Sequence, residues 1–263
     1  MITARKSVFD LLNRVISGGA YSNIALDTAL KKSGLGVRDK AFATALFYGV
    51  LERRITLDEI INKLTKGKNL DSNVKTALLM GLYQIIYMDS VPSSAAVNES
   101  VNLVKNKGAR GLVNAVLREY LRNGDKILKD APSFLIYSCP EWLFDKWALE
   151  YGEEKAILIA EQSVGVAPTV CRVNTTKVTE DELINILADE GITATKSDTI
   201  NALVLSNASI SESKAYTDGL FHIEDISFII FLLILILSEP LVMDIESYDK
   251  HGIPFTDHIV PVA

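Results

Sequence analysis

Hydrophobic residues in the first half of the chain recur at the spacing of amphipathic helices, in which one face is apolar. The first such stripe consists of Val8, Leu11, Leu12, Val15 and Ile16. Ser7 is its expected N-cap, and Gly18 and Gly19 are expected to end it. The same period predicts further helices around residues 42–50, 57–64, 74–86, 97–104 and 112–121. Short polar or glycine-containing connections between them indicate a compact helical bundle.

The pattern changes after Pro140. Two more helical stripes follow, around residues 142–147 and 156–160. A β-rich run then covers 169–174, a helical stripe covers 183–187, and strand-like segments cover 193–196 and 202–205. This order indicates a helical bridge followed by a small α+β unit.

The last segment of the chain is unlike the rest. Ten consecutive large apolar residues occupy 228–237, about half the ~20 residues that cross a bilayer as a helix. Acidic residues flank the run, and no basic residue stands beside it to anchor it at a membrane surface. The pattern favours a buried strand or helix, or an aggregation-prone remnant, over a membrane anchor.

Charge is distributed unevenly along the chain, whose overall net charge is −6. Residues 1–130 hold 20 Lys and Arg against 12 Asp and Glu, a net charge of +8, whereas residues 131–263 carry −14. A basic domain beside an acidic one suggests that the first part meets a polyanion such as nucleic acid. A solvated charged surface explains the same numbers and stays open.

Cysteine and histidine are scarce, which bounds the chemistry. Cys139 and Cys171 are far apart, and the three histidines, His222, His251 and His258, stand near the C-terminus. This spacing disfavours a zinc site or a disulfide scaffold, so no metal site is expected. No signal peptide is visible, and a reduced cytoplasmic setting is expected.

Several motifs occur together in register. They are Arg38-Asp-Lys-Ala-Phe-Ala43, Tyr48-Gly-Val-Leu-Glu52, Leu57-Asp58, Gly81-Leu-Tyr-Gln-Ile-Ile-Tyr87, Ala95-Ala-Val-Asn-Glu-Ser-Val101 and Gly111-Leu-Val-Asn-Ala-Val-Leu-Arg118. Together they resemble the NusB-like N-terminal domain of bacterial small-subunit rRNA cytosine C-5 methyltransferases of the RsmB (Sun) type. The likeness continues through 137–143, Trp147, 172–175 and 219–225.

The resemblance implies a fold that is mainly α: a NusB-like helical bundle followed by a small α+β domain, with no complete Rossmann-like methyltransferase domain. The expected organisation is a NusB-like RNA-binding domain at 1–126, a helical bridge at 127–167, a small α+β domain at 168–225 and a divergent tail at 226–263. The abrupt change at Ile226 suggests a frameshift or truncation, and a genuine diverged short protein is the alternative.

The family's catalytic features are not matched. Its Gly-rich Asp-x-Cys-Ala-Ala-Pro-Gly-Gly-Lys loop for S-adenosylmethionine is absent, and neither Cys139 nor Cys171 fits the motifs of its two catalytic cysteines. No catalytic or cofactor-binding residue is therefore assigned. S-adenosylmethionine is the cofactor of the full-length family, and this chain is expected to hold none and to be inactive alone.

The resemblance implies RNA binding, with small-subunit rRNA as the expected partner and a catalytic half in trans as a further partner. The candidate residues are basic positions at helix ends or opposite apolar stripes: Arg5, Arg38, Lys40, Arg53, Arg54, Lys105, Lys107, Arg110, Arg118 and Arg122. A solvated side chain is the alternative for each. A stand-alone NusB-like regulator of transcription, of the antitermination type, and a non-functional fragment are the alternative functions.

Overall fold

The computed structural model describes residues 3–19, 21–165, 167–206, 210 and 213–225, which contain twelve helices and four strands. The chain divides into two compact units, Met1–Gly165 and Val166–Ala263. The expectations for the tail, including its apolar run and the suggested frameshift, fall outside the described residues.

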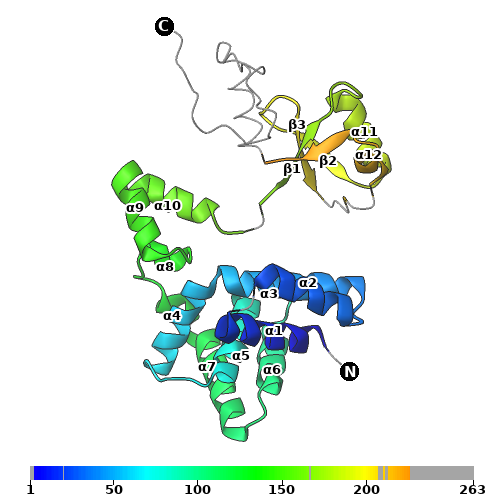
Figure 1. The fold of residues 1–263 in the computed structure, drawn as a ribbon. Coiled ribbons are helices and arrows are strands. Elements are labelled where there is room, and N and C mark those ends of the chain that lie inside the picture. The colour runs from blue at the N-terminus through cyan, green and yellow to red at the C-terminus, as the bar shows by residue number, and fades with distance from the viewer. Residues whose placement is uncertain (1–2, 20, 166, 207–209, 211–212, 226–263) are drawn as a thin grey trace, which may run out of the picture. The chain divides into compact units, whose positions relative to one another are not determined.

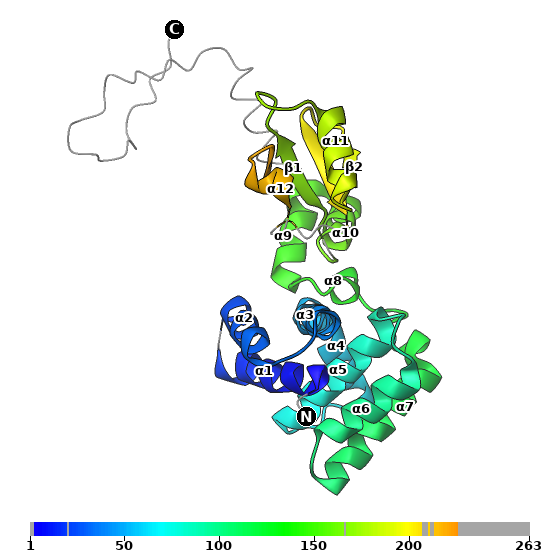
Figure 2. The same ribbon diagram turned by 90° about the vertical axis from the view of Figure 1, so that its right-hand side faces the viewer.

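The first unit is helical, and α5 lies at its centre, packed against α1, α3, α4, α6 and α7 (Figures 1 and 2). Its helices are α1 (Ala4–Gly18), α2 (Ser22–Lys32), α3 (Val37–Glu52), α4 (Arg54–Thr65), α5 (Ser72–Tyr87), α6 (Ser93–Leu103), α7 (Lys107–Ile127), α8 (Ser133–Ile136), α9 (Glu141–Tyr151) and α10 (Glu153–Gln162). The apolar stripes form one core, whose fully buried members include Leu12, Leu46, Phe47, Leu57, Leu78, Leu82 and Leu117. The predicted helical bundle is confirmed.

The first helix begins earlier than its apolar stripe indicates, so the prediction of Ser7 as N-cap is wrong. The cap is Thr3, whose Oγ1 accepts a hydrogen bond from the Lys6 N–H at 3.2 Å. The Ser7 N–H already donates to the Thr3 carbonyl at 3.0 Å, which places Ser7 inside the first turn. The predicted end is correct, because Gly19 adopts φ 64°, the left-handed conformation that terminates a helix.

Helices α8 to α10 form a second, smaller core in the same unit. Its buried members are Cys139, Phe144, Ala156 and Ala160, and Trp147 packs against them. Helix α8 also contacts α4, so this part of the expected bridge packs on the helical bundle.

The second unit is a four-stranded antiparallel sheet with helices on one face (Figure 1). Its elements are β1 (Thr169–Val173), α11 (Glu180–Asp189), β2 (Thr193–Lys196), β3 (Ala202–Ser206), α12 (Lys214–Thr217) and β4 (Phe221–Ile223). The strand order is β2-β3-β1-β4. The helix-facing core includes Cys171, Val173, Leu183, Leu187, Leu203 and Phe221. The predicted small α+β unit is confirmed, and the described residues contain no Rossmann-like doubly wound sheet.

Candidate nucleic-acid interface

Helix α7 gathers four of the ten basic candidates on its exposed side. Its buried side consists of Val113, Val116 and Leu117. At 100° per residue, Lys107, Arg110, Arg118 and Arg122 fall within an arc of about 120° that borders these buried positions. All four side chains are exposed, and we call them the α7 basic face.

Small residues lie between these cations. Gly111 and Ala115 are exposed on the same side of α7. A Cβ atom added at Gly111 would meet nothing within 4 Å, so the helix surface there is open. A nucleic-acid backbone can therefore approach the helix closely between Arg110 and Arg118.

Each arginine of the α7 basic face is held by one neighbour. Arg110 donates to Asn102 Oδ1 at 2.7 Å, and Arg118 donates to Asn114 Oδ1 at 2.9 Å. One such bond leaves most of the five guanidinium N–H donors free for a phosphate. The contacts therefore orient the side chains without using up their donors.

Arg122 differs because its neighbour is charged. It donates to Glu119, and that hydrogen bond, with a second from Asn123, lowers the pKa of the Glu119 carboxyl. Glu119 is therefore ionised at neutral pH and offsets part of the positive charge at this end of the face.

A pocket of about 590 Å³ lies in front of α7, between α1 and the starts of α5 and α7. Its polar lining residues are Lys6, Asp10, Asp71, Asn73, Lys105 and Asn106. Lys6 Nζ pairs with Asp10 at 2.5 Å, whereas Lys105 makes no ion pair within the described residues. Lys105 is therefore the lining cation available to an anion.

The start of α7 is not an open phosphate site, although Lys105, Lys107 and Arg110 gather around it. The Asn106 side chain accepts hydrogen bonds from the N–H groups of Gly108 and Ala109 at 2.8 and 3.2 Å. These helix-terminal donors are thus already satisfied within the chain. Binding here depends on the side-chain charges.

Three other candidates have structural contacts. Arg5 donates to the buried Gln84 at 2.7 Å, and its guanidinium lies 4.8 Å from the centre of the Phe42 ring. In the same way, Arg53 lies 4.8 Å over the Tyr87 ring, and Arg54 Nε lies 3.1 Å from Asp58 Oδ2. Arg5 and Arg53 thus join segments far apart in the sequence, which the local pattern does not reveal, whereas Arg54 pairs within α4.

The remaining candidates, Arg38 and Lys40, lie in the first turn of α3, where Arg38 is exposed and Lys40 is half-buried. Lys6 was not among the candidates, although it lines the same pocket as Lys105. Lys6 lies in the first turn of α1 with an acidic residue four positions on, and this pattern gave no signal of a site.

Neither cysteine is set up as a nucleophile. Both are free and buried, and burial raises the pKa of each thiol, that of Cys171 to about 11. A thiol with a raised pKa is poorly nucleophilic at neutral pH. Over the part of the chain that the structure describes, no group of three or more His, Cys, Asp or Glu side chains is arranged to hold a metal ion. Within that same part, no helix has the length and apolar character needed to span a membrane.

Two parts of the chain match known protein families. Residues 2–122 match the NusB family, and residues 139–211 match the ferredoxin-like domain of RsmF/B-like methyltransferases. A solved structure, "Crystal Structure of PH0851", shares the fold with a TM-score of 0.54 and 18% identity, over 88% of this chain and 55% of that one.

Two bacterial relatives agree with these matches. A probable ribosomal RNA small subunit methyltransferase B of Synechocystis is 34% identical over 206 residues, 74% of this chain and 46% of its own length. That of Bacillus subtilis is 30% identical over 236 residues, 85% of this chain and 52% of its own. The chain thus spans about half the length of these relatives. The chain thus carries a NusB domain and a ferredoxin-like domain of RsmF/B-like methyltransferases, and the named relatives at 30–34% identity are ribosomal RNA small subunit methyltransferase B.

Proposed function

We propose that this chain binds small-subunit rRNA, and that the α7 basic face and Lys105 provide the contacts to phosphates. The observation that carries the proposal is the alignment of Lys107, Arg110, Arg118 and Arg122 on one exposed side of a single helix. Contacts from such side chains to phosphates supply most of the affinity for nucleic acid and fix its position.

We assign the methyl transfer named in the relatives to a catalytic part outside residues 3–225. Cytosine C-5 methylation needs a thiolate nucleophile, and the buried thiols of Cys139 and Cys171 do not supply one. We expect S-adenosylmethionine to be the cofactor of the full-length relatives. No glycine lines either the pocket beside α7 or the smaller one beside β1, so neither offers the close backbone approach of a Gly-rich cofactor loop. Residues 3–225 therefore position RNA, in the cytoplasm, for a catalytic part that lies outside them.

A stand-alone regulator of transcription is the less favoured function. The observation that weighs against it is the ferredoxin-like domain match over 139–211, which links the NusB domain to RsmF/B-like methyltransferases. Co-purification with elongation factors in place of ribosomal subunits would support the regulator.

The experiment is a binding titration of a labelled small-subunit rRNA fragment at several salt concentrations. The double variant Arg118→Gln/Arg122→Gln removes two charges from the α7 basic face. We expect it to bind about tenfold or more weakly and to lower the slope of log affinity against log salt by roughly 1.5. The matched control is Lys32→Gln/Lys68→Gln, which removes two exposed charges from α2 and from the loop before α5. Equal losses in the two variants would contradict the assignment to α7.

A further inference from the structure

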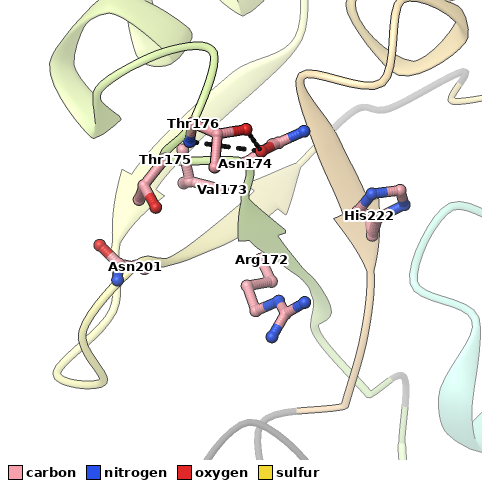
Figure 3. Close-up of a pocket in the computed structure, with 7 residues that line it drawn as sticks. All are labelled: Arg172, Val173, Asn174, Thr175, Thr176, Asn201 and His222. Carbon is pink, nitrogen blue, oxygen red and sulfur yellow. Dashed lines mark hydrogen bonds between the residues drawn. The ribbon is translucent and has the colours of Figure 1, made fainter.

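The ferredoxin-like domain carries a pocket of its own, of about 270 Å³, at one end of the sheet. Figure 3 shows its lining side chains. Arg172 and His222 come from the neighbouring strands β1 and β4, where they are paired in register. Asn174, Thr175 and Thr176 follow β1, and Asn201 precedes β3. Because Cys171, Val173 and Phe221 face the helices, the alternation of strands places Arg172 and His222 on the opposite face.

Backbone and side-chain hydrogen bonds fix the rim of this pocket. The Val173 N–H donates to the Asn201 carbonyl at 2.8 Å, and the Asn201 N–H donates to Glu180 Oε1 at 2.8 Å. Asn174 donates from Nδ2 to the Gly219 carbonyl at 2.9 Å and accepts from Thr176 Oγ1 at 2.6 Å. The pocket is therefore preformed, which lowers the entropic cost of binding.

The functional groups that remain in the pocket are one ion-paired guanidinium and three polar side chains that can donate and accept hydrogen bonds. The side chains of Arg172, Thr175, Asn201 and His222 make no hydrogen bond to the described residues. Arg172 Nε forms an ion pair with Glu224 Oε2 at 3.1 Å, and within the described residues no hydrogen bond engages the terminal nitrogens of the guanidinium. No carboxylate lines the pocket. A ligand with a phosphate or several hydroxyls matches this set.

The negative charge of this domain disfavours a long RNA backbone and favours a ligand that makes only a local contact. Residues 168–225 hold four Lys and Arg against ten Asp and Glu. Such a domain repels a polyanion at long range and does not track an extended RNA backbone. A pocket of this size, with one guanidinium in an acidic surround, fits a single phosphate with its attached sugar.

The face of the sheet also lacks a stacking platform. RNA-binding four-stranded sheets stack bases on aromatic side chains of their central strands. Here the corresponding positions of β1 and β3 are Val170, Arg172, Ala202 and Val204. His222 on β4 is the aromatic group of the pocket, so hydrogen bonding contributes more than stacking.

We propose that this pocket binds one nucleotide of single-stranded RNA, with the phosphate on Arg172, the base against His222, and the ribose hydroxyls on Asn201 and Thr175. The proposal rests on the RNA binding proposed above and adds a second, separate contact to it. Because the 2′-hydroxyl takes part, the pocket prefers a ribonucleotide to a deoxyribonucleotide.

The test is a nuclear magnetic resonance titration of the ¹⁵N-labelled full chain with uridine 5′-monophosphate, 2′-deoxyuridine 5′-monophosphate and inorganic phosphate. We expect uridine 5′-monophosphate to shift the amide signals of residues 172–176, 201 and 222 with a millimolar dissociation constant. The deoxy form should bind several-fold more weakly, and inorganic phosphate more weakly still. Absence of shifts, shifts elsewhere only, or equal binding of inorganic phosphate would overturn the proposal.

Two variants of the pocket and one control sharpen the result. Arg172→Gln should weaken binding about tenfold or more, because a charge-assisted hydrogen bond is removed. Asn201→Gly keeps the positive φ of 60° and removes the amide, so it tests the pocket without disturbing the ion pair of Arg172. Lys214→Gln removes an exposed charge from α12, on the helix-covered face, and should bind normally. Full binding by both pocket variants would refute the site.

The α7 variant separates this proposal from the first. Arg118→Gln/Arg122→Gln should lose affinity for the rRNA fragment while its pocket signals respond to uridine 5′-monophosphate as in the unaltered chain. Loss of fragment binding without any nucleotide response in the pocket would leave the first proposal standing and remove the second.

Discussion

The side-chain hydroxyl of Ser138 accepts a hydrogen bond from the backbone N–H of Ile55 at 3.0 Å, although the two residues are 83 positions apart. Ile55 is in the first turn of α4, whose N-cap Arg53 provides no side-chain hydrogen bond. Thr56 strengthens the link by donating from Oγ1 to the Leu135 carbonyl at 2.6 Å. The segment after α8 thus supplies the missing cap of α4 and ties the two parts of the first unit together.

Replacing Ser138 should loosen that link. We expect Ser138→Ala to lower the free energy of unfolding by about 1 kcal/mol, as for other N-cap deletions. Hydrogen exchange should quicken at the amides of Ile55 and Thr56, which no longer have this acceptor. The control is Ser133→Ala, since the Ser133 hydroxyl makes no hydrogen bond within the described residues. Equal protection of these amides in both variants would contradict the capping role.

Gly81 allows α5 to approach its neighbours closely. A Cβ atom there would lie 2.6 Å from Leu117 Cδ1 and 2.9 Å from Ser100 Oγ, both fully buried side chains. Gly81→Ala should therefore lower the free energy of unfolding by about 1–3 kcal/mol, the range for overpacked cores. Gly111→Ala is the matched control, because that helical glycine has open space around it and alanine should stabilise the helix by up to about 1 kcal/mol. Urea unfolding of both variants would show opposite shifts of the midpoint if the packing argument holds.

Much of the fold follows from local pattern. Strands expected at 193–196 and 202–205 appear as Thr193–Lys196 and Ala202–Ser206, because alternating and β-branched residues suit a half-buried sheet. The end of α1 was equally predictable, because Gly19 terminates the helix as expected. The start of α1 was not, because Thr3 and Ser7 are both good caps and the apolar stripe begins only at Val8.

The sites depend on contacts that the local pattern does not contain. Arg5 looks like an exposed cation in the sequence, yet it packs on Phe42 and bonds to Gln84, 79 residues away. Arg172 and His222 meet because β4 pairs with β1, a matter of strand order and not of periodicity. In contrast, the α7 basic face lies within one helix, so its members could be chosen from helical spacing alone.

The cluster of Lys105, Lys107 and Arg110 makes a prediction about charge. Since Asn106 already satisfies the Gly108 and Ala109 N–H groups, the cluster can act on RNA through its side chains alone. Neutralising all three to Gln should weaken binding across RNA sequences and reduce the salt slope by roughly 2–3, about one for each phosphate that is no longer neutralised. Asn106→Ala is the comparison: it should destabilise α7 by about 1 kcal/mol and leave the salt slope unchanged. A triple variant with full affinity at low salt would remove the cluster from the interface.

Cys171 predicts a dependence of stability on alkaline pH. Its side chain is fully buried in the core of the second unit, and burial raises the pKa of the thiol from 9.0 to about 11. Below pH 9 the thiol is protonated in both states and its contribution to stability is complete. Between about pH 9 and about pH 11 the unfolded chain loses this proton while the folded chain retains it, so the free energy of unfolding falls as pH rises. The fall is at most about 1.4 kcal/mol per pH unit.

Urea unfolding at about pH 8 and about pH 10.5 should show a smaller decrease in the free energy of unfolding for Cys171→Ala than for the unaltered chain. This comparison holds whatever stability the variant loses through its cavity. The thiol should likewise resist alkylation in the folded protein, because it is both inaccessible and protonated. An identical decrease with and without Cys171 would show that other groups govern the alkaline response.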